Sequence, residues 1–407
     1  MTHWWRDEAT ITRFVCDLIA AQLSTLRPNS YVAPPAPWHA SLHLGRDLGI
    51  DSLERVAVAS ALTEAIHLHE AGIEDRLLIG HTIGEWVAVA QEGLESFSST
   101  MTFRTSGSSG DPKRCDHLLS HLWQEVDALA PLFAGQRRVL SAVRSHHIYG
   151  FIFTTLLPRK LVAPGSAVVD LRHRVPTSVV GELQSRDLVV GYPDFWRSIA
   201  HSGISIPPGV VGISSTAPCP PDVAQRLVNA GLATLVEVYG SSETAGVGVR
   251  SHSEDPYTLM SFWLRREGEG EADSLLRVAP DGVLIPYQLQ DRLVWSDDRH
   301  FRPTGRVDGA IQVAGVNVFP TKIRGVLLDH PDVRDAAVRR ISDDALGRLK
   351  AFIVPRDERA GDATLHAELD AWVSSRLSAP ERPRSFTFGN TIPVQASGKL
   401  SDWPSIT

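Results

Sequence analysis

Four short apolar runs in the middle of the chain have the length and composition of strands buried on both faces, and they limit the fold more than any other feature. They cover residues 139–143, 188–191, 210–214 and 235–239. A helical stretch at residues 221–230 separates the last two, with proline at its start and glycine after its end. Because strands that alternate with helices indicate an α/β fold, we expect a helix-covered sheet within residues 98–306.

The regions on either side have other patterns. Residues 1–97 are helical in pattern, with apolar side chains from Ile11 to Leu23 forming one stripe. Residues 307–407 indicate a smaller α+β unit. The elements expected outside the central strands are helices over residues 11–23, 52–66, 82–91, 118–129 and 321–328, a hairpin around residues 314–315, and strands at 336–341 and 351–354.

The composition excludes several classes of protein. A net charge of -7 argues against nucleic-acid binding through phosphate neutralisation. No apolar run approaches the roughly 20 residues needed to cross a bilayer, and the first residues lack a secretory pattern. The three cysteines are far apart, which indicates reduced thiols and no zinc site. We therefore expect a cytoplasmic protein of two or three domains without a membrane or nucleic-acid partner.

A cluster of small and hydroxylated residues follows the N-terminal region, in the sequence Thr105-Ser-Gly-Ser-Ser-Gly-Asp-Pro-Lys113. Glycine lets backbone N–H groups close around an anion, the hydroxyls add donors, and Lys113 adds a charge. The spacing is not that of a P-loop, because Asp-Pro-Lys follows the second glycine. The alternative is a flexible Gly/Ser linker. The polyphosphate site predicted here consists of Thr105, Ser106, Gly107, Ser108, Ser109, Gly110 and Lys113.

Five motifs, in order along the chain, resemble those of the adenylate-forming superfamily. This superfamily contains acyl- and aryl-CoA synthetases, adenylation domains of non-ribosomal peptide synthetases, and luciferases. The glycine cluster is the first motif. The others are His147-Ile-Tyr-Gly150, Tyr239-Gly-Ser-Ser-Glu-Thr244, Gly305-Arg-Val-Asp-Gly309 and Pro393-Val-Gln-Ala-Ser-Gly-Lys-Leu400. The resemblance implies a two-step reaction, in which a carboxylate attacks the α-phosphate of ATP and a thiol then displaces AMP from the acyl-adenylate.

The resemblance also implies which residues bind ATP. The glycine cluster and Lys113 are implied to hold the β- and γ-phosphates, Glu243 to bind Mg²⁺, and Thr244 to contact the α-phosphate. Tyr239 is implied to stack on adenine. The alternatives are a core tyrosine, a glutamate that caps a helix and, at Asp291, a solvated loop aspartate. The other implied ATP-binding positions are Thr216, Ala217, Pro218, Gly240, Ser241, Asp291 and Arg306.

Further roles concern catalysis, the acid and domain motion. Lys399, together with Glu243 and Thr244, is implied to be catalytic, its ammonium bridging the substrate carboxylate and the α-phosphate as charge builds. The acid pocket is implied to include His147, Tyr149 and Gly240. A core histidine is the alternative for His147, and either core or pocket suits Tyr192 and Trp196. Asp308 is implied to be the hinge of the small domain.

The N-terminal region has a resemblance of its own. Residues 45–95 resemble an acyl carrier protein, and Asp47-Leu-Gly-Ile-Asp-Ser-Leu-Glu54 is similar to the carrier motif around the modified serine. This implies a 4'-phosphopantetheine arm on Ser52. The alternative is that Asp51 and Ser52 only cap a helix. The glycine cluster also begins earlier than is usual in the superfamily, so part of the large domain is expected to be missing or replaced.

Together these patterns favour a carrier-like helical bundle, a shortened large α/β domain and a small α+β domain. The resemblances imply ATP-dependent activation of a small carboxylic acid and its transfer to a carrier-protein thiol, on Ser52 or on a separate carrier. An aromatic acid is implied because residues 304–341 resemble benzoate-type ligases. A narrower resemblance is to ligases of aryl-polyene or xanthomonadin-type pigment pathways, which use 4-hydroxybenzoate. The alternatives are an acyl- or aryl-CoA ligase with a structural N-terminal unit, and a non-catalytic nucleotide-binding or docking module.

Overall fold

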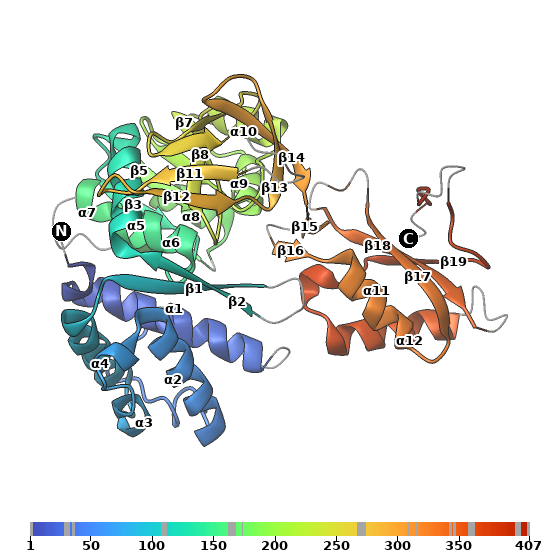
Figure 1. Ribbon diagram of the computed structural model, residues 1–407, viewed down its shortest axis with the longest axis horizontal. Coiled ribbons are helices and arrows are strands. Elements are labelled where there is room, and N and C mark those ends of the chain that lie inside the picture. Colours follow the sequence, from blue (N-terminus) through green and yellow to red (C-terminus); the bar gives the residue numbers. More distant parts are fainter. Residues whose placement is uncertain are drawn as a thin grey trace.

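The computed structural model describes residues 3–27, 33–34, 37–106, 112–161, 168–172, 174–266, 274–307, 309–313, 316–341, 344, 347–356, 363–394 and 400–404. Figure 1 shows a helical bundle below a sheet-containing region, and a C-terminal unit beside both.

The N-terminal bundle has the helices expected from the sequence. Its elements are η1 (Trp4–Arg6), α1 (Glu8–Leu26), α2 (Ser52–Ile66), η2 (Leu68–Glu70), α3 (Arg76–Ile79) and α4 (Ile83–Ser96). A capping box starts α2, because the Asp51 side chain accepts from the Glu54 N–H and the Glu54 side chain accepts from the Asp51 N–H. Thr82 and Glu85 start α4 in the same way. The predicted cap before Ser52 is therefore confirmed.

A hairpin connects the bundle to the sheet. Strands β1 (Thr100–Ser106) and β2 (Pro112–Leu118) are antiparallel, with Thr105 opposite Lys113. The described residues of the glycine cluster, Thr105, Ser106, Pro112 and Lys113, lie where these two strands end and begin, and residues 107–111 are outside the described part of the chain. In Figure 1 the hairpin runs between the bundle and the sheet.

Within the described residues, nine strands form the main sheet in the order β13-β14-β9-β8-β7-β6-β5-β3-β4. The strands from β7 to β4 are parallel, and those from β7 to β13 are antiparallel. All four predicted strands are confirmed, as β3, β5, β6 and β7. The strand bounds are β3 (Arg138–Ser141), β4 (Val169–Asp170), β5 (Asp187–Gly191), β6 (Val211–Ser214), β7 (Thr234–Ser241), β8 (Ala245–Arg250), β9 (Tyr257–Leu259), β13 (Asp291–Trp295) and β14 (His300–Arg306).

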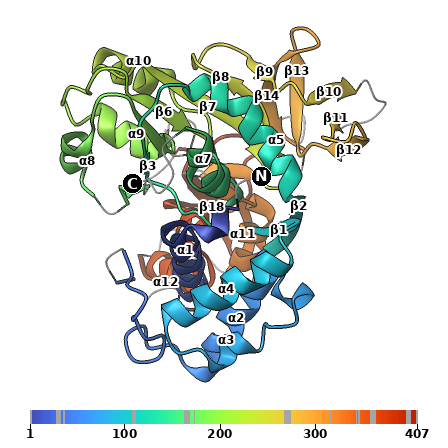
Figure 2. The same ribbon diagram turned by 90° about the vertical axis from the view of Figure 1, so that its left-hand side faces the viewer.

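Helices cover both faces of the parallel part. Alternate β5 side chains face opposite layers, with Leu188 and Val190 in one core and Val189 in the other. Figure 2 shows α8, α9 and α10 on one side of the strands and α5 on the other. The helix bounds are α5 (Leu119–Leu129), η3 (Ala130–Phe133), α6 (Ile148–Phe151), α7 (Pro158–Leu161), α8 (Pro176–Glu182), α9 (Pro193–Ala200) and α10 (Pro221–Asn229), with a π-helical segment η4 (Ile152–Leu156) between α6 and α7. A second sheet contains β10 (Trp263–Arg266), β11 (Ser274–Val278) and β12 (Leu284–Gln288).

The bundle and the sheet share one apolar core. The Trp4 ring lies 5.1 Å from the Phe151 ring of α6, and the Phe14 ring of α1 lies 5.8 Å from it. Trp4, Phe14 and Phe151 are almost completely buried. Helix α1 therefore packs into the sheet region as well as into its own bundle.

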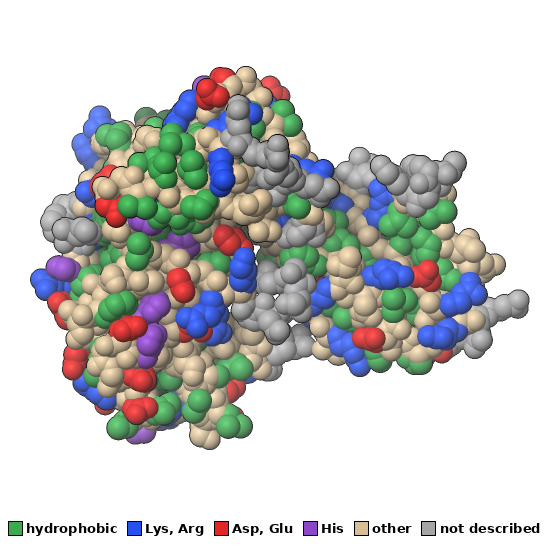
Figure 3. Space-filling model, in the orientation of Figure 1, with side chains coloured by type: hydrophobic (Ala, Val, Ile, Leu, Met, Phe, Trp, Pro, Cys, Tyr) green, Lys and Arg blue, Asp and Glu red, His purple; other side chains and the backbone are tan. Residues whose placement is uncertain are grey.

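The C-terminal unit is α+β, as expected. It contains β15 (Ile311–Val313), β16 (Val316–Val318), α11 (Pro320–Leu328), β17 (Val333–Arg340), β18 (Leu349–Pro355), α12 (Ala363–Arg376), η5 (Ala379–Glu381) and β19 (Ser385–Phe388). Side chains of α11 and α12 join those of β17 and β18 in a core of their own. In the space-filling view this unit forms a separate lobe (Figure 3). No helix in the described part of the chain is long and apolar enough to cross a membrane.

Candidate active site

The predicted site residues follow the carboxyl ends of the parallel strands. Gly191 at the end of β5 lies beside Ser214 of β6, and Ser214 lies beside Glu237 of β7. The chain leaves β3 toward β4 on one side and returns to β5 on the other, so the sheet has a switch point between β3 and β5. Ligands of open α/β sheets bind outside the carboxyl ends at such points. The topology alone therefore predicts a ligand-binding site at this edge.

Two predicted nucleotide-binding residues touch at the antiparallel side of this edge. The Tyr239 hydroxyl donates a hydrogen bond of 2.7 Å to Asp291 Oδ2. Burial, and then the Asp291 carboxylate, raise the pKa of Tyr239, so its hydroxyl stays a donor. Asp291 lies opposite Arg306 in the β13–β14 pair. The structure thus brings together Tyr239, Asp291 and Arg306, although 67 residues separate the first from the last.

The Tyr239 ring is fixed by other aromatic residues. Its centroid lies 5.6 Å from that of Tyr257 and 5.3 Å from that of Phe301. Both partners are almost fully buried. The sequence analysis did not identify them, because the three-residue strand β9 and the polar strand β14 have no clear apolar alternation.

The turn after β7 is held by its own hydrogen bonds. Ser241 N–H donates to Thr244 Oγ1 at 3.1 Å, and the N–H groups of Glu243 and Thr244 donate to Ser241 Oγ at 3.2 Å each. A Cβ on Gly240 would lie 2.1 Å from the Ala245 carbonyl oxygen, so the turn needs glycine there. Ala245 has a φ of 59°, a conformation unusual for alanine. This turn sets the positions of the Glu243 and Thr244 side chains without any ligand.

Strand β2 of the β1–β2 hairpin contacts the turn after β7 through two side chains. Lys113 Nζ lies 3.3 Å from Glu243 Oε1, and both side chains are partly exposed. His117 Nε2–H donates to the Ser242 carbonyl at 2.6 Å. The pKa of His117 is lowered by burial, which favours the neutral ring. Lys113, implied to hold phosphates, and Glu243, implied to bind metal, are therefore neighbours in the structure, and both roles stay predictions.

The Glu243 carboxylate suits a Mg²⁺ ion that takes its other ligands from phosphate and water. The described residues contain no group of three or more metal-binding side chains, so protein atoms alone do not form a metal cage there. Glu243 supplies one accessible carboxylate. Mg²⁺ is commonly held by one or two carboxylates with substrate phosphates and water. Glu243 would hold a Mg²⁺ ion that arrives with ATP.

A buried ion pair supports the loop after β6. Glu237 of β7 pairs with Arg250 of β8 at 3.0 Å, and its Oε2 accepts from the Cys219 N–H at 2.8 Å. Cys219 directly follows Thr216, Ala217 and Pro218, the segment predicted to flank adenine. Thr216 has a φ of 79°. A charged residue between Val236 and Val238 in a buried strand was the signal that the sequence analysis could have used.

A buried carboxyl lies behind the same turn. Glu125 of α5 is 0 % exposed, and its Oε2 accepts from the Gly246 N–H at 2.9 Å. Its Oε1 has no hydrogen-bond partner among the described residues. Burial raises the pKa of Glu125 to about 7, with the Gly246 N–H and the Arg277 charge opposing the shift. His117 and Glu125 therefore hold the backbone on both sides of Glu243 and Thr244.

The predicted acid-binding residues lie at the switch point. His147 follows β3, and Tyr149 Oη donates to the Gly191 carbonyl of β5 at 2.8 Å, so these residues bridge the two strands. The His147 side chain is exposed. Partial loss of hydration beside the surrounding protein, with the Arg144 charge, lowers the pKa of His147 to about 4. The imidazole is therefore neutral at neutral pH.

Other predicted residues lie elsewhere or outside the described part of the chain. Trp196 is buried and donates to the Ile213 carbonyl at 3.0 Å, so it belongs to the core. Tyr192 is partly exposed at the end of β5. Ser52 is exposed on the bundle. The positions not described are Gly107, Ser108, Ser109, Gly110, Asp308 and Lys399, together with the side chains of Thr105 and Ser106.

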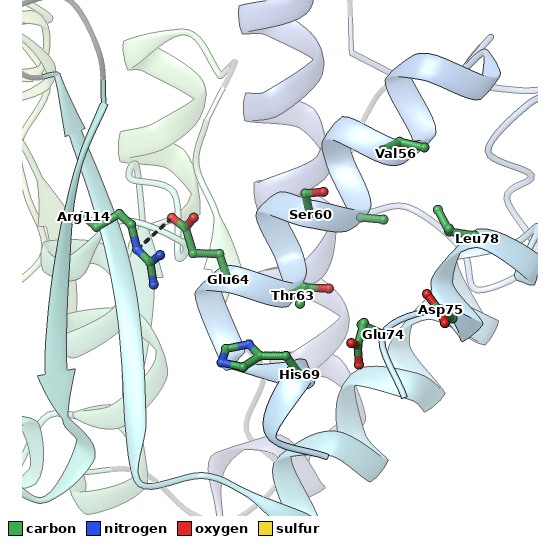
Figure 4. Close-up of a pocket in the computed structure, with 10 residues that line it drawn as sticks. Val56, Ser60, Thr63, Glu64, His69, Glu74, Asp75, Leu78 and Arg114 are labelled. Atoms are coloured by element: carbon green, nitrogen blue, oxygen red, sulfur yellow. Dashed lines mark ion pairs between the residues drawn. The ribbon is translucent and has the colours of Figure 1, made fainter. Parts of the chain in front are cut away.

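A separate groove lies on the bundle. It has a volume of about 260 Å³ and lies between α2 and the segment that leads into α3 (Figure 4). Arg114 of β2 pairs with Glu64 at its edge, at 3.8 Å. None of the predicted site residues lines it. The groove therefore does not belong to the candidate active site.

Comparison with known proteins identifies the family. The family model described as the AMP-binding enzyme C-terminal domain matches residues 322–399. The chain is 40% identical over 350 residues to a 4-coumarate–CoA ligase of Halorhodospira halophila, an alignment that covers 86% of this chain and 87% of the relative. It is 34% identical over 406 residues to a 4-coumarate–CoA ligase of Rhodobacter capsulatus, covering 97% and 100%. The chain belongs to the adenylate-forming superfamily, within its acid–CoA ligases.

A solved structure agrees on the fold. The o-succinylbenzoate CoA synthetase of Bacillus subtilis is similar at a TM-score of 0.61 with 18% identity, over 95% of this chain and 91% of that one. The predicted superfamily and the large and small domains are thus confirmed. The alignment with the Rhodobacter capsulatus protein covers that protein's whole length, and the expectation that part of the large domain is missing or replaced stays a prediction. The carrier-protein resemblance of residues 45–95 stays a prediction.

Proposed function

We propose that this chain activates a small aromatic carboxylic acid with ATP and transfers the acyl group to the thiol of CoA. The observation that carries this proposal is the meeting of Lys113, Glu243 and Thr244 beside the Tyr239–Asp291 pair at the carboxyl edge of the sheet. The relatives named 4-coumarate–CoA ligase support an aromatic acid and CoA as substrates.

In the first step, an oxygen of the acid attacks the α-phosphorus of ATP, and the bond from that phosphorus to the bridging oxygen breaks. Pyrophosphate leaves with the electron pair. Lys113 neutralises charge on the departing phosphates, and the Thr244 hydroxyl contacts the α-phosphate. Lys399 is proposed to bridge the acid and the α-phosphate. Bound Mg²⁺ supplies further neutralisation of the phosphates.

In the second step, the thiol sulfur attacks the acyl carbon and AMP leaves, while the thiol proton passes to solvent. The positions of Tyr239 and Asp291 suit adenine and ribose, so the nucleotide stays in one place through both steps. The rotation of residues 307–407 about Asp308 between the steps is part of the proposal.

The acid is proposed to bind at the switch point. Because the pKa of His147 is lowered to about 4, its ring is uncharged at neutral pH. An uncharged ring and the Tyr149 face suit an aromatic acid such as a hydroxycinnamate or a hydroxybenzoate better than an anionic chain.

A second candidate for the acceptor of the acyl group is the phosphopantetheine thiol of a carrier protein. Ser52 is exposed at the first residue of α2, where an added phosphate would meet the helix N-terminus. Intact mass after incubation with a phosphopantetheinyl transferase tests modification of Ser52. A chain that gains no mass, but forms acyl-CoA, leaves the N-terminal unit with a structural role.

ATP–pyrophosphate exchange tests the activation step. The panel contains 4-coumarate, 4-hydroxybenzoate, benzoate and an aliphatic acid of similar length. We expect exchange that depends on an aromatic acid, followed by acyl-CoA formation when CoA is added. Exchange with none of these acids would favour the remaining alternative, a non-catalytic nucleotide-binding or docking module.

A further inference from the structure

One buried carboxylate of the N-terminal helix reaches the segment that carries the acid-binding histidine. Asp17 of α1 is 4 % exposed. Its Oδ2 accepts two hydrogen bonds of 2.7 Å, from the N–H and from the hydroxyl of Ser145. Its Oδ1 pairs with Arg172. Asp17 is thus 128 residues away from Ser145 in sequence and in direct contact in space.

The Ser145 segment is buried and tightly packed, and it leads directly to His147. Ser145 is 1 % exposed, and it lies between the end of β3 and the start of α6. A Cβ on Gly150 would lie 1.8 Å from the Arg144 carbonyl oxygen, so the first turn of α6 packs tightly against this segment. A displacement of Ser145 would therefore be transmitted to His147 and to the helix that begins after it.

Arg172 connects the Asp17 carboxylate to the neighbouring strand β4. Its guanidinium also binds Asp170 at the end of β4, with distances of 2.5 to 3.1 Å. Asp17 therefore joins the exits of two neighbouring parallel strands, β3 and β4. Buried charges with several hydrogen bonds fix a geometry more strictly than apolar contacts do.

A second residue of α1 binds the helix that follows His147. Arg13 donates to the Thr154 carbonyl in the π-helical segment η4. Because the π-helical turn departs from the regular hydrogen-bond ladder, an outside donor stabilises it there. Two charged side chains one turn apart on α1 thus contact the segment before α6 and the η4 turn after it.

We propose that Asp17 is a positioning residue for the acid subsite, acting through Ser145 on the orientation of His147. The inference rests on the proposed function, because it assumes that the acid binds beside His147. It makes the N-terminal helix part of the active-site structure. Asp17 itself touches neither the acid nor ATP.

The test compares variants that affect Asp17 with one that affects only packing. Asp17→Ala removes all contacts, Asp17→Asn keeps an oxygen that accepts from Ser145, and Ser145→Ala removes only the hydroxyl. Leu23→Ala, on the same helix and fully buried in the bundle core, is the control for lost stability. Each variant is assayed by ATP–pyrophosphate exchange with 4-coumarate, below its melting temperature.

We expect Asp17→Ala to raise the KM for the acid at least tenfold and to leave the KM for ATP within about twofold. Asp17→Asn and Ser145→Ala are expected to show smaller increases in the same constant. Leu23→Ala is expected to lower the Tm without changing the acid KM. An unchanged acid KM in all three site variants, or equal changes in both KM values, would overturn the inference.

A readout independent of turnover separates this inference from the proposed function. The imidazole resonances of His147, assigned with His147→Ala, are compared in the wild type and in Asp17→Asn by NMR. A shifted His147 resonance in Asp17→Asn, absent in Leu23→Ala, supports the positioning role even if the wild type activates no acid. An unshifted resonance contradicts it, whatever the activity. If Asp17→Ala fails to fold, Asp17→Asn and Ser145→Ala decide the outcome.

Discussion

At the scale of single residues, the candidate site depends on polar groups whose partners lie far away in the sequence. Tyr239 and Asp291 show this most clearly, because each fixes the other with one hydrogen bond of 2.7 Å. A carboxylate held by a partly buried tyrosine can still accept hydrogen bonds from two neighbouring hydroxyls on its free lone pairs. Such a pair suits the two hydroxyls of a ribose.

Asp291→Ala is predicted to weaken ATP binding selectively. Loss of hydrogen bonds to a charged group costs about 2 kcal/mol, so the KM for ATP should rise about 30-fold. The KM for the acid should not change, because Asp291 lies on the antiparallel side of the sheet edge. Exchange kinetics measure both constants. Tyr239→Phe, which removes only the hydroxyl, serves as a milder control, and an unaltered ATP constant in Asp291→Ala would remove this residue from the nucleotide site.

Glu125→Gln is predicted to change how stability depends on pH. In the folded protein the pKa of Glu125 is raised from 4.5 to about 7, so the folded state holds the proton more tightly than the unfolded state. This contribution to stability is full below about pH 4.5 and is lost as the pH rises to about 7, a total of about 3 kcal/mol. Because glutamine does not titrate, Glu125→Gln should not lose this stability as the pH rises.

Thermal unfolding at pH 5 and pH 8 measures this effect. The Tm of Glu125→Gln minus that of the wild type should be more positive at pH 8. A difference that is the same at both pH values would show that Glu125 does not titrate in this range.

At the scale of secondary-structure elements, the two faces of strand β2 contact different parts of the molecule. Lys113 and His117 face the turn after β7, whereas Arg114 and Asp116 face the bundle. Asp116 accepts from Thr102, which in turn accepts from the His67 Nε2–H at 2.9 Å. Helix α2 therefore supports the back of the strand that presents Lys113.

Breaking the β7–β8 ion pair is predicted to destabilise the fold strongly. Glu237→Gln leaves the buried Arg250 without its full counter-charge, which costs about 3 to 5 kcal/mol. The double variant Glu237→Gln/Arg250→Gln should lose less than the sum of the single losses. Urea unfolding followed by circular dichroism measures all three. Strictly additive losses would mean that the two side chains do not interact.

The comparison of sequence with structure is most instructive at this scale. Helix α2 and strands β5 to β7 were predictable, because their apolar spacing and caps are local. Strand β2 was not, because Lys113 to His117 lack apolar alternation. Their polar side chains are satisfied by Glu64, Glu243 and other partners that only the fold brings near. The motif residues were found by resemblance, whereas the supporting Glu125 and Glu237 belong to no motif.

At the scale of the whole molecule, the N-terminal bundle is continuous with the sheet region. The rings of Trp4 and Phe14 pack on Phe151, and Asp17 lies in a polar network with Ser145 and Arg172. A carrier domain has to move with its arm between sites. The buried contacts of α1 favour a structural unit instead.

Removal of residues 1–97 is predicted to abolish folding of the rest. The truncated chain 98–407 would expose the apolar surface around Phe151 and leave Arg172 without Asp17. We expect aggregation in size-exclusion chromatography and no cooperative unfolding. A monomeric 98–407 fragment with exchange activity would show instead that residues 1–97 form an independent domain.

Lys399→Ala is predicted to slow adenylation strongly without unfolding the protein. Loss of one charge that stabilises the transition state lowers such rates by about 10² to 10³. Lys160→Ala is the matched control, because Lys160 lies outside the candidate site, where it pairs with Asp127 and lies 5.8 Å from the Trp123 ring centroid. Both variants should keep the wild-type Tm. An exchange rate of Lys399→Ala equal to that of the control would exclude Lys399 from the mechanism.

The central claim is that the carboxyl edge of the sheet holds the nucleotide, and a crystal structure with bound AMP tests it most directly. We predict density for adenine against the Tyr239 ring, ribose hydroxyls within hydrogen-bond distance of Asp291, and the phosphate at Thr244. AMP bound elsewhere, for example in the groove beside α2, with this edge empty, would contradict the account.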